Sequence, residues 1–258
     1  MKKLISLFLG VSVLLLAACS KQPDTASSEQ KNDAAGLQTV VIASTGSDAD
    51  IWRHIASLPE TKAAGIKLEV KNFTDYVAMN TAVANKEVDL NAFQSYAYLV
   101  AFNAANKDKI APVSTTYLEP MGIYSNKVKK VEEFAQGATI AIPNDGANES
   151  RALLLLQSAG LIKLKPDFDP VKGTPADIIE NSKKIVIKPI QMATAVRVKD
   201  EVDAILLGNT LAMEGGLNVL KDAIFYEPID QTTKLNVNVL ATAESRKDDA
   251  VLQKVGAL

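Results

Sequence analysis

The chain has 258 residues, of which 47% are hydrophobic and 22% are charged, and its formal net charge is −2. This length suits two compact lobes or one larger domain, and this hydrophobic content is enough for a packed core. A slightly acidic chain does not have the basic footprint that nucleic-acid binding requires. We therefore expect no nucleic-acid partner.

The first twenty residues have the organisation of a bacterial export signal. Lys2 and Lys3 give a positive start, and the apolar run 4–16 that follows is too short to span a bilayer. The run continues into Leu-Ala-Ala-Cys, which resembles the lipobox of bacterial lipoproteins, and Cys19 is the only cysteine. We predict a signal peptide over residues 1–18, lipidation of Cys19, and an extracytoplasmic domain anchored to a bacterial membrane, on the periplasmic side if the cell has two membranes.

Residues 20–36 are polar and contain no large apolar side chain. Such a segment cannot bury enough surface to fold, so residues 19–37 are predicted to be a flexible tether.

Short apolar runs typical of strands alternate with helical patterns from residue 38 onward. The expected strands are 38–43, 66–73, 110–116, 139–142, 185–189, 204–207 and 235–241. The expected helices are 49–57, 76–86, 96–106, 148–159, 192–199 and 210–215. This alternation predicts an α/β fold with mostly parallel sheets covered by helices.

Two segments are predicted to cross between lobes. Residues 117–124 contain Pro and Gly near the middle of the chain, and residues 230–234 are polar and precede the last expected strand. The crossings predict one lobe from residues 38–118 plus 236–258 and a second from 123–233. Two lobes joined in this way leave a cleft, where small ligands commonly bind.

Metal and nucleophile chemistry has little support in the sequence. His54 is the only histidine, so no histidine-rich metal site can form, and a Ser-His-Asp triad would have to use it. Its expected helix has an ordinary amphipathic face, which favours a surface or packing role. We predict no metal, no cofactor and no enzymatic activity, with a tethered hydrolase using His54 as the alternative.

A candidate anion site follows the expected strand 139–142. A turn leads into a helix expected to start near Asn148, a good N-cap residue, and Arg151 would then lie in the first helical turn. A cation there opposes the helix dipole, but it is well placed if the guanidinium and the helix-start amides hold a carboxylate. An Arg–Glu surface pair, for instance with Glu149, is an equal alternative.

Aromatic and amide side chains gather in two segments, 72–76 and 89–99, at expected strand ends. Strand ends face the cleft in open α/β sheets, so these rings could hold an apolar ligand group while amides bond its polar head. The alternative is that the rings fill a core. The candidate rings are Phe73, Tyr76, Phe93 and Tyr98. Asn209 and Asn238 are further candidates, as ligand contacts or as buried amides with internal partners.

Several motifs resemble those of methionine-binding lipoproteins of the MetQ/NlpA family. They are Asp-Leu-Asn-Ala-Phe-Gln at 89–94, Pro-Asn-Asp at 143–145, Arg-Ala-Leu-Leu-Leu-Leu-Gln at 151–157 and Gly-Leu-Ile-Lys-Leu-Lys at 160–165. The resemblance extends from about Val40 onward. It implies two α/β lobes of the periplasmic-binding-protein type (type II-like) closing over one amino acid, with an ABC permease and its ATPase as partners.

The resemblance also implies roles for individual residues. Arg151 would pair with the ligand carboxylate, supported by Asn148, and the four candidate rings would line a thioether pocket. Asn209 and Asn238 would bond the amino and carboxylate ends of the ligand.

The chain departs from the family pattern in three places. Ser95 stands where the family often has histidine, Leu211 lies near Asn209 where tyrosine is often found, and relatives continue beyond Leu258. The departures suggest a different ligand, such as D-methionine, a methionine derivative or a short peptide, and a truncated C terminus. A lipoprotein of the same fold with a non-transport role at the cell envelope is a further alternative.

Overall fold

The computed structural model describes residues 36–258, apart from the side chains of residues 231 and 232, and these residues belong to one compact unit. The predicted signal peptide, the lipidation site at Cys19 and nearly all of the predicted tether lie outside the described residues. No helix between residues 36 and 258 has both the length and the apolar character needed to cross a membrane.

Five strands form the first sheet, in the order β2-β1-β3-β12-β4. They are β1 (Gln38–Ser44), β2 (Ile66–Asn72), β3 (Leu90–Ser95), β4 (Ile110–Leu118) and β12 (Val237–Ala243). β1 is parallel to β2 and β3, whereas β12 lies antiparallel between β3 and β4.

Five other strands form the second sheet, in the order β11-β5-β10-β6-β9. They are β5 (Met121–Tyr124), β6 (Thr139–Pro143), β9 (Val186–Ile190), β10 (Ala204–Gly208) and β11 (Phe225–Tyr226). β10 is parallel to β6 and antiparallel to β5. A separate hairpin pairs β7 (Lys163–Leu164) with β8 (Ile178–Glu180).

The α/β class is confirmed, but the prediction of mostly parallel sheets is wrong. Each five-stranded sheet has two parallel and two antiparallel pairings. The reason is the double crossing of the chain. β5 enters the second sheet directly after β4 and runs against β10, and β12 returns to the first sheet and runs against both of its neighbours.

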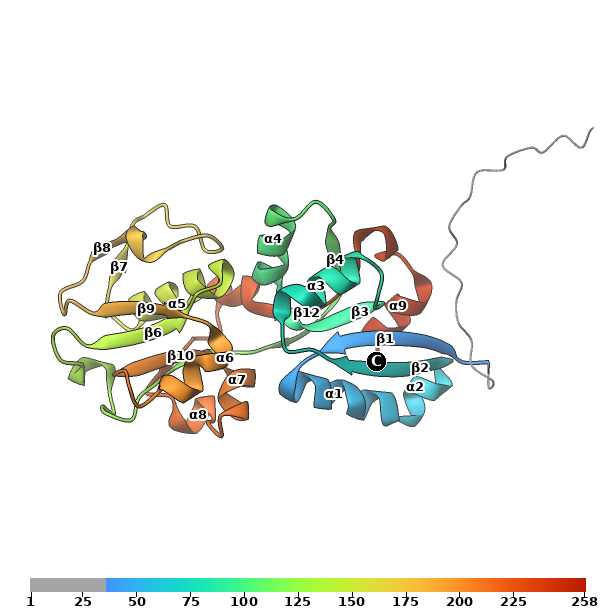
Figure 1. The fold of residues 1–258 in the computed structure, drawn as a ribbon, viewed down its shortest axis with the longest axis horizontal. Helices are drawn as coiled ribbons and strands as arrows, with labels where there is room; N and C mark the ends of the chain where they lie inside the picture. The colour runs from blue at the N-terminus through green and yellow to red at the C-terminus, as the bar shows by residue number, and fades with distance from the viewer. Residues whose placement is uncertain (1–35) are drawn as a thin grey trace, which may run out of the picture. The chain divides into compact units, whose positions relative to one another are not determined.

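Helices cover both faces of the first sheet. Figure 1 shows α3 (Tyr76–Ala84) and α4 (Tyr96–Ala105) on one side and α1 (Gly46–Ser57) with α2 (Pro59–Ala63) on the other. α9 (Ala250–Gly256) packs on the α1 side, because its Leu252 and Val255 belong to the same buried cluster as Trp52. The α3 and α4 side has its own core, which contains Met79 and Phe102.

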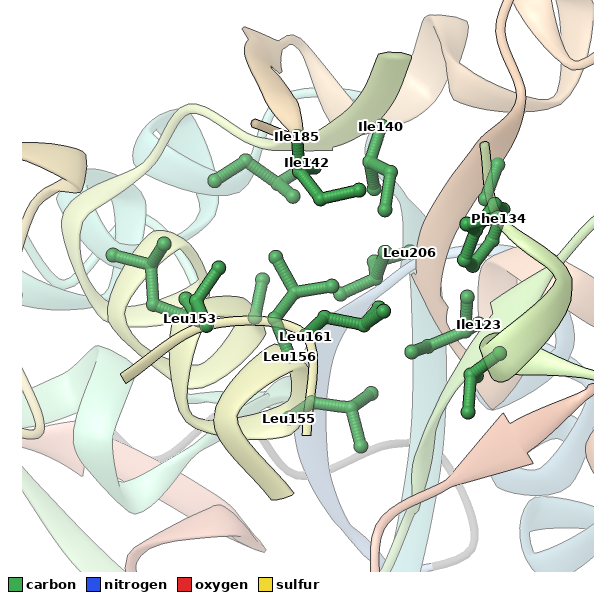
Figure 2. Close-up of a cluster of buried hydrophobic side chains, with 14 of the residues drawn as sticks. Ile123, Phe134, Ile140, Ile142, Leu153, Leu155, Leu156, Leu161, Ile185 and Leu206 are labelled. Carbon is green, nitrogen blue, oxygen red and sulfur yellow. The ribbon is translucent and has the colours of Figure 1, made fainter. Parts of the chain in front are cut away.

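The second sheet is covered in the same way. α5 (Gly146–Ser158) packs its leucines on one face, where Leu153 and Leu156 meet Ile140, Ile142 and Leu206 in the largest core (Figure 2). The other face carries α6 (Met192–Ala195), α7 (Asn209–Glu214) and α8 (Val219–Asp222). Short 3₁₀ turns complete the fold at Val131–Glu133, Pro175–Asp177, Val196–Val198, Gln231–Asn236 and Glu244–Arg246.

Each sheet is built from a different part of the chain, and the two parts are separated near the segments that the sequence predicted to be crossings. The first sheet takes its strands from residues 38–118 and 237–243, and the second from residues 121–226. The second sheet thus begins at Met121, inside the segment that the sequence assigned to a crossing. The lobe boundaries at 38–118 plus 236–258 and at 123–233 stay a prediction.

Candidate ligand-binding site

An inner cavity of about 50 Å³ lies where strands of both sheets end. Thr45 directly follows β1, Ser95 ends β3, and Gly208 ends β10, while Arg151 lies on the helix that follows β6. In open α/β sheets the carboxyl ends of parallel strands are the usual place for a ligand. The cavity is lined by Thr45, Asp48, Tyr76, Phe93, Gln94, Ser95, Tyr98, Glu119, Asn148, Arg151, Met192, Gly208, Thr210, Leu211 and Asn238.

Six of the eight residues singled out in the sequence line this cavity, namely Tyr76, Phe93, Tyr98, Asn148, Arg151 and Asn238. The other two do not. Phe73 packs against the core of the α3 and α4 side, and Asn209 donates from Nδ2 to the sulfur of Met213 at 3.2 Å. His54 is exposed on α1 and does not line the cavity. The ligand-binding roles of all eight residues stay a prediction.

Three aromatic rings form one wall of the cavity. The centroids of Tyr76 and Phe93 are 5.2 Å apart, and Tyr98 meets both rings edge-on, at 6.3 Å from Tyr76 and 5.8 Å from Phe93. Burial raises the pKa of both tyrosines above the ordinary value, so their hydroxyls stay protonated. An apolar ligand group can therefore pack against the faces and edges of these rings, which are held in position by their contacts with one another.

Three buried amides fix the strand behind this wall. Asn80 on α3 donates from Nδ2 to Gln94 Oε1 at 2.9 Å, and its Oδ1 accepts from Gln94 Nε2 at 2.7 Å and from Asn91 Nδ2 at 2.8 Å. Gln94 Nε2 also donates to Asn91 Oδ1 at 2.8 Å. All three residues are at most 2% exposed, so the network holds β3 against α3 and fixes Gln94 at the cavity.

The helix carrying Arg151 starts earlier than the sequence predicted. α5 begins at Gly146, and its N-cap is Asp145, whose Oδ1 accepts from the backbone N of Asn148 at 3.1 Å and from Asn148 Nδ2 at 2.9 Å. Asp145 is a better N-cap than Asn148 here because its carboxylate takes two donors at once. Arg151 therefore lies in the second turn, where the helix dipole bears on it less.

Arg151 is paired inside the protein. Its Nε donates to Glu227 Oε1 at 2.8 Å and its Nη2 to Glu227 Oε2 at 2.6 Å, and Nη2 also donates to the carbonyl of Glu119. Both side chains are 8% exposed. Glu227 is held further by the backbone N of Met121 at 2.8 Å and by Asn236 Nδ2 at 3.2 Å. Arg151 thus has a glutamate partner, but the pair is buried and uses Glu227, so it is not the surface pair that the sequence suggested as an alternative. Among the residues that the structure describes, the Nη1 nitrogen of Arg151 has no hydrogen-bond partner, unlike Nε and Nη2.

Two buried carboxylates that the sequence analysis missed lie in the same cavity. Asp48 is 4% exposed and accepts from the hydroxyl of Tyr117, and its Oδ1 lies 3.3 Å from the hydroxyl oxygen of Thr210. Glu119 is 9% exposed and accepts from the backbone N and the hydroxyl of Thr210 and, at 3.3 Å, from Asn238 Nδ2. Together they give the cavity two acids beside the Arg151 guanidinium, and such carboxylates suit a cation such as an ammonium group.

Burial raises the pKa of Asp48 to about 6, with the Glu119 carboxylate adding to the rise and the Tyr117 hydroxyl opposing it. As pH rises, the unfolded chain loses the Asp48 proton near its ordinary pKa of 3.8, whereas the folded protein keeps that proton up to a pH of about 6. Between these values the native state holds more protons, so the stability contributed by this group falls as pH rises from about 4 to above 6.

We expect Asp48→Asn to remove this pH dependence. In the wild type the loss between pH 4 and pH 7 should amount to at most about 3 kcal/mol, because each pKa unit corresponds to about 1.4 kcal/mol. Urea unfolding at the two pH values measures it, with Asp50→Asn, an exposed position on the same helix, as the control. A difference of the same size in the wild type and in Asp48→Asn would contradict the assignment.

An outer cavity of about 440 Å³ adjoins the inner one. The two share Thr45, Tyr76, Tyr98, Met192 and Leu211, so these side chains separate one cavity from the other. The charged side chains that line the outer cavity are one cation, Arg197, and three acids, Asp75, Asp145 and Glu214. Burial raises the pKa of Glu214, and the negative charge of the nearby Glu119 raises it further.

Two sheets that send their strand ends to one cavity, which is lined by charged groups of both signs and by aromatic rings, define a two-lobed substrate-binding protein. A solved nutrient-binding protein from Burkholderia cenocepacia, bound to methionine, has the same fold. Its TM-score is 0.77 at 34% identity, covering 84% of this chain and 89% of that one.

The sequence profile of the NlpA lipoprotein family matches residues 40–258, and the chain belongs to that family. It is 37% identical over 254 residues to outer membrane lipoprotein 2 of Mannheimia haemolytica, covering 98% of this chain and 89% of the relative. It is 35% identical over 251 residues to a probable D-methionine-binding lipoprotein MetQ of Pasteurella multocida, covering 97% and 89%. The family prediction is confirmed, and the chain is a substrate-binding protein, not an enzyme.

Proposed function

We propose that this protein captures methionine outside the cytoplasm and delivers it to the permease and ATPase of an ABC importer, while a lipid on Cys19 tethers it to the membrane. The observation that carries the proposal is that one cavity contains buried groups of both charge signs and an aromatic wall. A zwitterionic ligand with an apolar side chain needs charged groups for its ammonium and carboxylate and an apolar wall for its side chain. Relatives described as methionine-binding lipoproteins and a neighbour bound to methionine support it.

The charged groups suggest how the ligand is oriented. Its ammonium lies against Asp48 and Glu119, and its carboxylate takes Nη1 of Arg151 with the amide of Asn148. The thioether then rests on Tyr76, Phe93 and Tyr98, where sulfur–ring contacts contribute about 0.3–1.5 kcal/mol. Ligand bound to groups from both sheets favours the closed arrangement, and closure forms the surface that a permease recognises.

Isothermal titration of the full chain in a non-ionic detergent tests the proposal, after unfolding and refolding to remove co-purified ligand. We expect one-to-one binding of L-methionine and, from the sulfur–ring contacts, binding of norleucine that is about 2- to 12-fold weaker. D-methionine in the same series gives the stereochemical preference. No heat with either methionine enantiomer from a folded protein would exclude methionine as the ligand.

Comparing Tyr98→Leu with a matched surface variant tests whether the aromatic wall contributes to methionine binding apart from any general effect on folding. We expect methionine affinity to fall at least about fivefold, since the ring contributes both area and sulfur contacts. Tyr226→Leu, at a 44%-exposed position on β11, is the matched control and should bind as the wild type does. Equal affinities in the two variants would remove Tyr98 from the site.

A methionine-containing short peptide is a second candidate ligand. The outer cavity favours it, because this cavity adjoins the inner one and contains Arg197, which could pair with the carboxylate of a second residue. Competition of methionyl dipeptides against methionine in the same titration distinguishes the two ligands.

A further inference from the structure

The ion pair between Arg151 and Glu227 lies where the chain passes between the two sheets. The chain runs from β4 to β5 through residues 119–120, the outward passage, and from β11 to β12 through residues 227–236, the return passage. Glu227 is the first residue of the return passage, and Asn236 is the last. A side chain that bonds to both passages from this place can fix them relative to each other.

The carboxylate of Glu227 accepts four hydrogen bonds. Its Oε1 accepts from Arg151 Nε at 2.8 Å and from Asn236 Nδ2 at 3.2 Å. Its Oε2 accepts from Arg151 Nη2 at 2.6 Å and from the backbone N of Met121 at 2.8 Å. The backbone N of Glu227 also donates to the carbonyl of Met121 at 3.0 Å. Four donors fill the acceptor capacity of a carboxylate, and Glu227 does not line the inner cavity, so it acts on a ligand only through these partners.

These bonds leave one nitrogen of Arg151 for a ligand. Its Nε donates to Glu227, and its Nη2 donates both to Glu227 and to the carbonyl of Glu119 in the outward passage. Nη1 has no partner among the described residues, and it is not one of their enclosed unpaired atoms, so it is open to the inner cavity that Arg151 lines. The direction of Nη1 is therefore set by the atoms that hold the other side of the guanidinium.

We infer that Glu227 is a positioning residue, which is anchored by both passages, aims Nη1 of Arg151 at the ligand and so sets the preference of the site for a carboxylate. This inference rests on the proposed function, in which Nη1 meets the carboxylate of methionine. Two parallel hydrogen bonds between a carboxylate and a guanidinium fix the plane of the guanidinium as well as its distance. An arginine released from these bonds has several rotatable bonds, so its guanidinium no longer points in one direction. The competing explanation is that Glu227 only stabilises the fold or only neutralises the charge of Arg151.

Titration of the full chain in a non-ionic detergent with L-methionine and with L-methioninamide tests the inference. The amide keeps the ammonium and the thioether of methionine but has no negative charge. We expect the wild type to bind methionine about tenfold more tightly than the amide, since hydrogen bonds between charged groups are the stronger ones. Glu227→Asp keeps the charge but is too short to reach both Arg151 and the passages, so the preference should fall below about threefold. An unchanged preference in Glu227→Asp would overturn the inference.

Glu227→Gln separates position from charge. This side chain keeps the length, but its NH2 group faces a donor in either orientation, so the guanidinium should turn and the preference for methionine should fall as in Glu227→Asp. A larger preference than in the wild type would mean that Glu227 only neutralises Arg151. A role in folding alone would weaken the binding of both ligands by the same factor and leave the preference unchanged. Either result would overturn the inference.

Glu201→Asp, at an exposed position before β10, is the matched control and should keep the wild-type preference. If neither Glu227 variant folds, Asn236→Ala replaces them, because it removes one donor of the return passage and keeps the ion pair. Its preference for methionine should fall about two- to threefold, and an unchanged value would overturn the inference. A wild type that binds neither ligand refutes the proposed function itself, whereas one that binds methionine no better than the amide refutes only this inference.

Discussion

Arg151→Ala should lower the free energy of unfolding by about 3–5 kcal/mol, because it leaves Glu227 buried without its cation. The same change should weaken methionine binding by more than about tenfold, since it removes the only cation among the described residues that line the inner cavity. Affinity loss in this variant alone therefore does not separate a ligand anchor from a structural ion pair.

Glu227→Gln in the Arg151→Ala background separates the two roles. The glutamine side chain keeps an acceptor for the backbone N of Met121 but carries no charge, so the double variant should regain about 2 kcal/mol of stability over Arg151→Ala. Methionine binding should stay weak, because the guanidinium is still missing. Urea unfolding and titration of the same samples measure both quantities.

Arg53→Ala is the control for loss of an arginine. Arg53 pairs with Asp50 at 2.5 Å on the surface of α1, where both side chains are about half exposed or more, so the change should alter stability by less than about 1 kcal/mol. If the double variant is no more stable than Arg151→Ala, the pairing with Glu227 does not explain the loss. If methionine affinity in Arg151→Ala equals that of the wild type, Arg151 is a structural residue only.

The helix that carries Arg151 could be predicted from the sequence, but its first residue and the partner of Arg151 could not. The turn after β6 and the helix behind it are local signals, whereas Glu227 lies 76 residues further along the chain, and no local pattern connects the two. Asp48 and Glu119 were missed for the same reason. Single acidic residues are common on surfaces, and only the packing of α1, the crossing segment and α7 shows that these two are buried.

Strand β3 was not predicted from the sequence, because polar residues within the segment mask the apolar pattern that is typical of a buried strand. Asn91 and Gln94 interrupt the apolar run 90–95, so the segment was assigned to ligand binding and not to a strand. Both amides face Asn80 and are satisfied by it, which makes them compatible with a buried strand. The alternation of strands and helices predicted the α/β class, but strand direction depends on the double crossing, which is a tertiary feature.

Asn80→Leu should lower the free energy of unfolding by about 3 kcal/mol, at nearly unchanged volume. Asn80 is fully buried, and its loss leaves both Asn91 and Gln94 with unpaired polar atoms. Methionine binding should weaken as well, because Gln94 lines the inner cavity and is held there through Asn80. Asn85→Leu, at an exposed position just after the same helix, is the matched control and should change neither quantity appreciably.

Replacing the whole network tests whether unpaired polar groups are the cause. The triple variant Asn80→Leu, Asn91→Leu and Gln94→Met has no polar side-chain atom left in the network, so it should be more stable than Asn80→Leu alone. Its methionine affinity should not recover, since the amide of Gln94 is gone from the cavity. A triple variant less stable than the single one would mean that shape, and not hydrogen bonding, makes these amides necessary. Recovery of stability without binding would show that one network both holds β3 in place and presents a polar group to the ligand.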